Sequence, residues 1–174
     1  MAYIIDLDLD RCVACAACVV ACMDQNDVYP EKGDAPFRRC FDVERGAGKT
    51  ARISYMSIGC MHCSDAPCIA ACPVGCLRKD EETGFTVYDN TNCIGCHSCN
   101  MACPFAAPTF NRDSKMVKCD GCAERLKAGL EPACVRVCPF DALKLEAADE
   151  YVKSRQRKSL RRIALGAEQL EAGN

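Results

Sequence analysis

The stretch "CIGCHSCNMACP", from Cys93 to Pro104, decides which kind of fold this chain adopts. Its four cysteines are separated by two, two and three residues, and Pro104 follows the last of them. Three thiolates this close together can surround one centre, and this spacing with its closing proline is typical of bacterial [4Fe–4S] sites. The fourth cysteine of such a run commonly ligates the other cluster of a pair. The stretch therefore predicts a second motif elsewhere in the chain.

Three further cysteine motifs are present, and each keeps the leading C-x2-C and the closing C-x3-C. Only the middle gap varies, from two residues in motifs I and III to four in motif II and eleven in motif IV. Motif III is the opening stretch. The motifs are Cys12, Cys15, Cys18 and Cys22 (I); Cys60, Cys63, Cys68 and Cys72 (II); Cys93, Cys96, Cys99 and Cys103 (III); Cys119, Cys122, Cys134 and Cys138 (IV). Proline follows the last cysteine in II, III and IV, whereas motif I has Met23 there.

The cysteine content restricts the class of protein. The chain has 174 residues, of which 18 are cysteines, a density that indicates disulfides in a short secreted protein. The N-terminus "MAYIIDLDLDRC" has neither an apolar signal core nor a cleavage site, and no apolar run is long enough to span a bilayer. The repeated spacing also favours metal over disulfide bridges. Disulfides and a zinc-stapled interaction module remain the alternatives, although zinc usually uses two separated C-x2-C pairs.

The net charge and the small apolar content further restrict the class of protein. The formal net charge is −2, and four oxidised clusters would bring it to about −10, which argues against nucleic acid as a partner. The hydrophobic fraction of 49% includes the cysteines, and there is no tryptophan. We therefore expect bound metal to supply part of the folding free energy.

Four segments of alternating polar and apolar residues flank the motifs and predict strands, at Tyr3–Leu9, Arg52–Ile58, Phe85–Asp89 and Ala142–Glu146. With the cysteine runs between them, they predict an α+β fold of a few short strands and helices, stabilised by metal. We expect two nested bacterial-ferredoxin-like units. The outer unit is residues 1–50 and 104–148 with motifs I and IV, and the inner unit is residues 51–103 with motifs II and III. Sequential pairing, I with II and III with IV, is the alternative.

On the nested interpretation the fourth cysteine of each motif crosses to the partner cluster, which gives four ligand sets. Set 1 is Cys12, Cys15, Cys18 and Cys138; set 2 is Cys60, Cys63, Cys68 and Cys103; set 3 is Cys93, Cys96, Cys99 and Cys72; set 4 is Cys119, Cys122, Cys134 and Cys22. These sixteen cysteines are the predicted iron ligands of four [4Fe–4S] clusters. We predict no catalytic residue, because no Ser/His/Asp set, phosphate-binding loop or pterin-binding domain is recognisable.

The four motifs, with II and IV stretched, resemble the electron-transfer (iron–sulfur, beta) subunits of the dimethyl sulfoxide reductase family of molybdenum enzymes. The resemblance covers about residues 3–146 and is strongest in "CIGCHSCNMACPFAAPTFN" and "KCDGCAERLKAGLEPACVRVCPFDAL", where it is closest to the dimethyl sulfoxide reductase branch. It implies four clusters with the I–IV and II–III pairing. It also implies docking on a large catalytic subunit that holds a molybdenum or tungsten bis-pterin cofactor, with a membrane anchor or a soluble donor as a further partner.

The function that follows is a non-catalytic electron relay in an anaerobic respiratory-type oxidoreductase. The alternatives are a free-standing polyferredoxin or a relay subunit of a hydrogenase or formate complex. The resemblance implies a membrane-associated complex, and the compartment stays open between the periplasm, reached by co-export with the partner, and the cytoplasm.

Several residues near the motifs have two interpretations. Cys40 and Cys76 fall outside the motifs and are expected to be buried apolar thiols. His62 and His97 either donate to a cluster sulfur or are polar residues at a surface or interface. Gly95 and Gly121 are expected where the backbone approaches a cluster closely.

Residues 149–174 are predicted to form a basic C-terminal helix or tail, which is either a solvated face or a docking arm. Its cations are Lys153, Arg155, Arg157, Lys158, Arg161 and Arg162.

Overall fold

The computed structural model describes the backbone of residues 2–171 and the side chains of residues 2–157, 159 and 160. Strands in this part of the chain form four antiparallel pairs and no larger sheet. The pairs are β1 (Tyr3–Leu7) with β8 (Leu143–Ala147), β2 (Arg39–Arg45) with β3 (Arg52–Ile58), β4 (Leu77–Lys79) with β5 (Thr86–Tyr88), and β6 (Thr109–Phe110) with β7 (Met116–Val117). An isolated two-stranded pair is marginally stable, so the fold depends on contacts between the pairs rather than on a continuous sheet.

The helices follow the cysteine motifs, and they are short apart from the last. They are α1 (Ala17–Gln25), α2 (Pro67–Ala70), α3 (Ser98–Ala102), α4 (Ala123–Lys127), α5 (Ala133–Arg136) and α6 (Ala148–Glu171), with 3₁₀ turns η1 (Pro30–Lys32) and η2 (Gly48–Thr50). The third cysteine of every motif lies in a helix: α1, α2, α3 and α5 in turn. Helix α4 occupies the long gap of motif IV. The α+β fold with short helices and strands is confirmed.

The predicted strands correspond to β1, β3, β5 and β8. The expected Arg52–Ile58 coincides with β3, and the other three agree within two residues at each end. Strands β2, β4, β6 and β7 were not predicted. β1 and β8 pair in the register Tyr3↔Ala147 to Leu7↔Leu143, so the segment before motif I lies beside the segment after motif IV.

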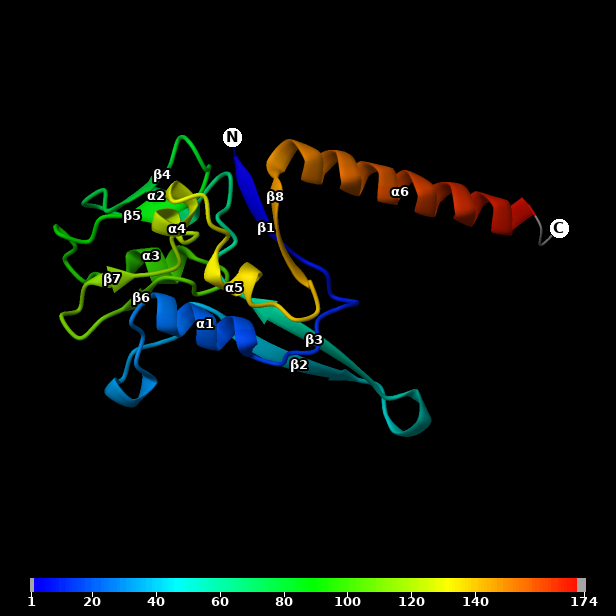
Figure 1. The fold of residues 1–174 in the computed structure, drawn as a ribbon, viewed down its shortest axis with the longest axis horizontal. Helices are drawn as coiled ribbons and strands as arrows, with labels where there is room; N and C mark the ends of the chain where they lie inside the picture. Colours follow the sequence, from blue (N-terminus) through cyan, green and yellow to red (C-terminus); the bar gives the residue numbers. More distant parts are fainter. Residues whose placement is uncertain (1, 172–174) are drawn as a thin grey trace.

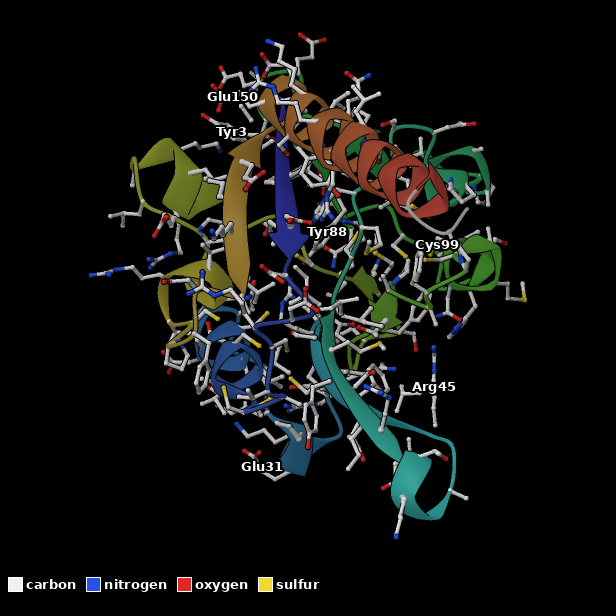
Figure 2. All side chains as sticks on the ribbon, turned by 90° about the vertical axis from the view of Figure 1, so that its right-hand side faces the viewer. Tyr3, Glu31, Arg45, Tyr88, Cys99 and Glu150 are labelled. Carbon is white, nitrogen blue, oxygen red and sulfur yellow. The ribbon has the colours of Figure 1, made fainter. Side chains whose placement is uncertain are left out.

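The core consists of two small clusters in which cysteines replace much of the usual aliphatic content. One contains Ala66, Cys68, Cys76, Leu77, Cys99 and Met116, and the other contains Cys18, Cys134, Val135 and Leu143. In Figure 2 the sulfur atoms lie mostly in the body of the molecule, Cys99 among them. A core of this composition gains little from apolar burial alone.

Helix α6 begins beside β1 and β8 and then extends away from the rest of the molecule (Figure 1). Its start is fixed by the Ala148 amide, which donates to the Ala2 carbonyl at 2.9 Å, and by Arg155, 2.6 Å from Asp6. Lys153 lies 3.8 Å from Asp149 on the same helix. The side chains of Lys158, Arg161 and Arg162 lie outside the described residues, and with them half of the predicted basic run. Among the described helices, none has the length and apolar character needed to cross a membrane.

Candidate metal centres

Three cavities in the molecule are each lined by four motif cysteines, and two of them also by one cysteine from outside the motifs, Cys40 or Cys76. The first contains Cys12, Cys15, Cys18 and Cys138; the second Cys60, Cys63, Cys68 and Cys103; the third Cys72, Cys93, Cys96 and Cys99. The structure thus brings together the members of ligand sets 1, 2 and 3. Each cavity combines the first three cysteines of one motif with the last cysteine of another.

The cysteines of set 4 also lie near one another. Cys22 and Cys134 belong to α1 and α5, which pack together, and the electrostatic effects of Cys122 and Cys119 place these two beside Cys22. Burial, followed by the proximity of Cys134 and Cys122, raises the pKa of Cys22 to about 12. Burial also raises the pKa of Cys119, with contributions from Cys60 and Cys22. A buried thiol with a raised pKa is poorly ionised by itself, and a bound metal supplies the positive charge that stabilises the thiolate.

The arrangement of the thiols fits a multi-iron cluster better than a single ion. Within the described residues, no group of three or more His, Cys, Asp or Glu side chains is arranged to ligate one metal ion directly. A zinc site draws its sulfurs to about 2.3 Å from a single point. Here the thiols line the walls of a cavity instead, as ligands of a [4Fe–4S] cluster do.

The loops between the first two cysteines share one backbone feature. The residue before the second cysteine has a positive φ in all four motifs: Ala14 (51°), His62 (46°), Gly95 (65°) and Gly121 (79°). Glycine adopts this conformation freely, whereas other residues lose about 1–2 kcal/mol. A Cβ at Gly121 would lie 2.1 Å from Phe85 Cδ2, and one at Gly95 would lie 2.7 Å from the Ser114 carbonyl oxygen. These two glycines therefore permit close approach to protein atoms as well as a left-handed turn.

The fourth cysteine of motifs II, III and IV accepts a hydrogen bond from the backbone amide four residues later. The amides of Cys76, Ala107 and Ala142 lie 3.3, 3.4 and 3.3 Å from the sulfurs of Cys72, Cys103 and Cys138. Hydrogen bonds of this kind stabilise thiolate charge and are among the factors that set cluster potentials. In motif I the side chain of Asn26 takes this place, 3.7 Å from the Cys22 sulfur.

His62 is a partly buried hydrogen-bond donor to a sulfur rather than a polar surface residue. Its Nδ1 accepts the amide of Thr86 at 3.0 Å, so the ring proton lies on Nε2, which is 3.5 Å from the Cys119 sulfur. Burial, and then the cations of Lys118, Lys79 and Arg38, lower the pKa of His62 well below its usual range, so the ring is neutral. His97 lines the set 3 cavity and stacks on Phe110 with ring centroids 3.7 Å apart.

Two buried cations lie among the thiols, and sequence reasoning missed both. Arg38, 6% exposed, donates to Ser57 Oγ at 3.1 Å, and that oxygen is 3.2 Å from the Cys18 sulfur. Although burial lowers the pKa of Arg38, the nearby sulfurs of Cys134 and Cys119 raise it overall. Lys118, 1% exposed, donates to the backbone carbonyls of Thr86 and Cys119 and lines the set 2 cavity. Only the position of Lys118 next to a motif cysteine could have signalled a role.

The two cysteines outside the motifs lie beside ligand sets. Cys76 is 5% exposed, as expected for a buried thiol, and burial raises its pKa to about 11. Cys40 lines the set 1 cavity and packs against the second core cluster, but it is half-buried rather than buried. It lies in β2, whose pairing with β3 leaves one side open to solvent.

Cavities that each contain four motif cysteines, with amides hydrogen-bonded to their sulfurs, define an iron–sulfur protein of the electron-transfer class. The similarity of this chain to known proteins supports the same class. Residues 51–148 match the family described as a 4Fe-4S dicluster domain. One relative, a chain of the anaerobic dimethyl sulfoxide reductase of Escherichia coli K12, is 40% identical over 156 residues, which cover 84% of this chain and 74% of that one. The thiosulfate reductase electron transfer subunit PhsB of Salmonella typhi is 40% identical over 150 residues, covering 85% and 77%.

A more distant relative is the iron-sulfur subunit of the nitrate-inducible formate dehydrogenase of Escherichia coli K12. It is 31% identical over 176 residues, covering 93% of this chain and 60% of that one. The protein belongs to this family of iron–sulfur electron-transfer subunits. The names of these relatives describe chains or subunits of oxidoreductases, in keeping with a non-catalytic role.

Proposed function

We propose that this chain holds four [4Fe–4S] clusters on ligand sets 1 to 4. It relays electrons through them to or from the molybdenum or tungsten bis-pterin cofactor of a larger catalytic partner. The observation that supports the proposal is that three cavities each join three cysteines of one motif to the last cysteine of another. When bound, each cluster takes up and releases one electron at a time.

The nested organisation is part of the same proposal. The outer unit comprises residues 1–50 and 104–148, and the inner unit comprises residues 51–103, with residues 149–174 as the C-terminal helix or tail. The antiparallel pairing of β1 with β8 and the packing of α1 on α5 support the outer unit, because they join the flanks of motifs I and IV. The packing of α2 on α3 supports the inner unit. The β2–β3 hairpin crosses the boundary and links the two.

The ligand sets follow one another in the order 1, 4, 2, 3 on this proposal. Arg38 interacts with the sulfurs of Cys18 in set 1 and of Cys134 in set 4, which supports the first step. His62, from motif II, contacts Cys119 of set 4, which supports the second. Sets 2 and 3 adjoin through α2 and α3. Each set supplies four thiolates, so no coordination position is left for a substrate.

The two ends of this order are where partners would dock. Cys15 of set 1 and Cys96 of set 3 are exposed, and the other two sets contain no exposed cysteine. Apolar side chains on the cavity walls reach the surface at both ends. Val13 and Phe140 are each 44% exposed beside set 1, and Ile94 is 64% exposed beside set 3. Exposed apolar residues next to a redox centre suit a protein partner that must come close.

A catalytic partner is favoured over a free-standing polyferredoxin because the relatives reported above are named as parts of larger reductases and a dehydrogenase. The test is co-expression with a candidate large subunit. The complex should copurify with molybdenum or tungsten, and Cys96→Ser should slow electron transfer from the physiological donor while dye-driven turnover at the large subunit survives. Cys40→Ser is the matched control and should change neither rate. Substrate reduction by the isolated chain with dithionite and viologen would contradict the proposal.

A further inference from the structure

A polar bridge connects the inner and outer ligand sets at the point where sets 2 and 4 meet. We infer that His62, Thr86 and Lys118 set the reduction potentials of the two clusters on either side of this junction. The inference rests on the proposed assignment of sets 2 and 4. Nothing in the cysteine spacing requires these three residues, which come from motif II, from β5 and from the segment just before motif IV.

His62 supplies the link toward set 4. The Thr86 amide occupies its Nδ1 at 3.0 Å, which leaves the Nε2–H to point at the Cys119 sulfur, 3.5 Å away. The ring is held in this orientation by Phe85, whose centroid lies 4.5 Å from its own. Lys79 Nζ donates to the His62 carbonyl at 2.9 Å and fixes the backbone as well. A residue carried on the motif II loop is thus positioned to donate to a ligand of the other unit.

Lys118 and Thr86 act on set 2. The Lys118 ammonium is buried and is held by the carbonyls of Thr86 and Cys119, with no carboxylate among its hydrogen-bond or ion-pair partners in the described part of the chain. A buried cation is costly unless it has anionic neighbours, and the nearest anions available are the thiolates of a loaded cluster. Thr86 Oγ1 is buried and has no hydrogen-bond partner among the described residues, yet its residue lines the set 2 cavity.

The direction of the effect follows from charge. Reduction makes a cluster more negative, so donors and cations near its sulfurs stabilise the reduced form and raise its potential. Removing the His62 donor should lower the potential of the set 4 cluster. Removing the Lys118 charge should lower the potentials of both neighbouring clusters, because its ammonium donates to the Cys119 carbonyl and Lys118 also lines the set 2 cavity. The clusters on sets 1 and 3 should respond much less.

The test is an EPR-monitored redox titration of full-length protein, with iron measured in every sample. His62→Phe should reduce the ratio of reduced to oxidised set 4 cluster about tenfold at its wild-type midpoint, a shift of about 59 mV for one electron. His62→Gln, which keeps a donor, should recover most of the shift. Lys118→Met should shift two midpoints, whereas Lys127→Met, at a surface lysine paired with Glu124, should shift none. Unchanged midpoints in the His62 and Lys118 variants would overturn the inference.

A second readout needs no change at His62. The chain has only two histidines, so ¹⁵N-histidine labelling of otherwise natural protein reports on His62 and His97 alone. Pulsed EPR of the reduced protein should detect a histidine nitrogen coupled to a cluster, and the coupling should persist in His97→Phe. Its absence from the labelled protein would overturn the role of His62. An iron content below that of four clusters in natural protein would instead count against the proposed function.

Discussion

The side-chain nitrogen of Asn26 lies 2.7 Å from the Cys22 carbonyl oxygen and 3.7 Å from the Cys22 sulfur. This relationship replaces, in motif I, the backbone hydrogen bond that the last cysteine accepts in the other three motifs. The cause is Met23. A proline there has no N–H and disfavours continued helix, whereas Met23 lets α1 run on to Gln25. Because the helix continues, the backbone amide of Asn26 donates to the Met23 carbonyl. The side-chain amide of Asn26 therefore donates to the Cys22 sulfur in place of a backbone amide.

Asn26→Leu should therefore lower one cluster potential, that of set 4, without loss of iron. A hydrogen bond to a charged acceptor contributes about 1.4 kcal/mol, which corresponds to about 59 mV for a one-electron couple. A redox titration of the variant against natural protein measures the shift. Asn26→Asp cannot donate and should give a shift at least as large. A potential that is unchanged in both variants would mean that Asn26 only caps α1.

Gly121→Ala should prevent correct assembly of the junction between β5 and motif IV. The added Cβ would meet the ring of Phe85, a side chain only 1% exposed that has no free space to move into. Gly129→Ala is the matched control: its φ is also positive, at 72°, but nothing lies within 4 Å of the new Cβ. It should cost only about 1–2 kcal/mol of backbone strain. Equal iron content in the two purified variants would contradict this explanation.

Three of the four strands that the sequence did not predict are very short. Residues Arg52–Ile58 stood out because seven residues give a clear pattern, and they form β3. β4, β6 and β7 have two or three residues each. β5 is equally short, but the pattern from Phe85 to Asp89 extends beyond it at both ends. β2 was missed although Phe41 and Val43 alternate with Asp42 and Glu44, so its signal was present.

The cysteines were predictable because local spacing alone reveals them, whereas their surroundings were not. Arg38 belongs to no motif, and only the fold brings it close to Cys18 and Cys134. The burial of Lys118 likewise depends on β5, which is distant in sequence. His62 had the right residue type in the right loop, but its partner Cys119 belongs to another motif. Long-range contacts of this kind leave no local pattern in a single sequence.

Removal of the metal should unfold the body of the molecule rather than empty a preformed site. Cys68, Cys99, Cys18 and Cys134 are members of the two core clusters, and without iron their thiols have only weak apolar contacts to replace the bonds. Oxidative cluster removal with a chelator should abolish amide-exchange protection across β4, β5, α2 and α3. Protection in these elements that survives complete iron loss would show that the apolar core suffices.

The exchange of fourth cysteines is tested by Cys22→Ser. This change should perturb the cluster on Cys119, Cys122 and Cys134, because burial and these neighbours define the environment of Cys22. Sequential pairing instead predicts damage to the cluster on Cys60, Cys63 and Cys68. An experimental structure of the variant distinguishes the two outcomes. Cys40→Ser and Cys76→Ser are the controls, and both should retain the full iron content.

The most direct test of the four-cluster relay is the iron and acid-labile sulfide content of the anaerobically purified natural chain. Four [4Fe–4S] clusters require about sixteen iron and about sixteen sulfide per chain. Mössbauer spectra of the same sample should assign all of the iron to four-iron clusters. An iron content near eight, or stoichiometric zinc in place of iron, would contradict the account.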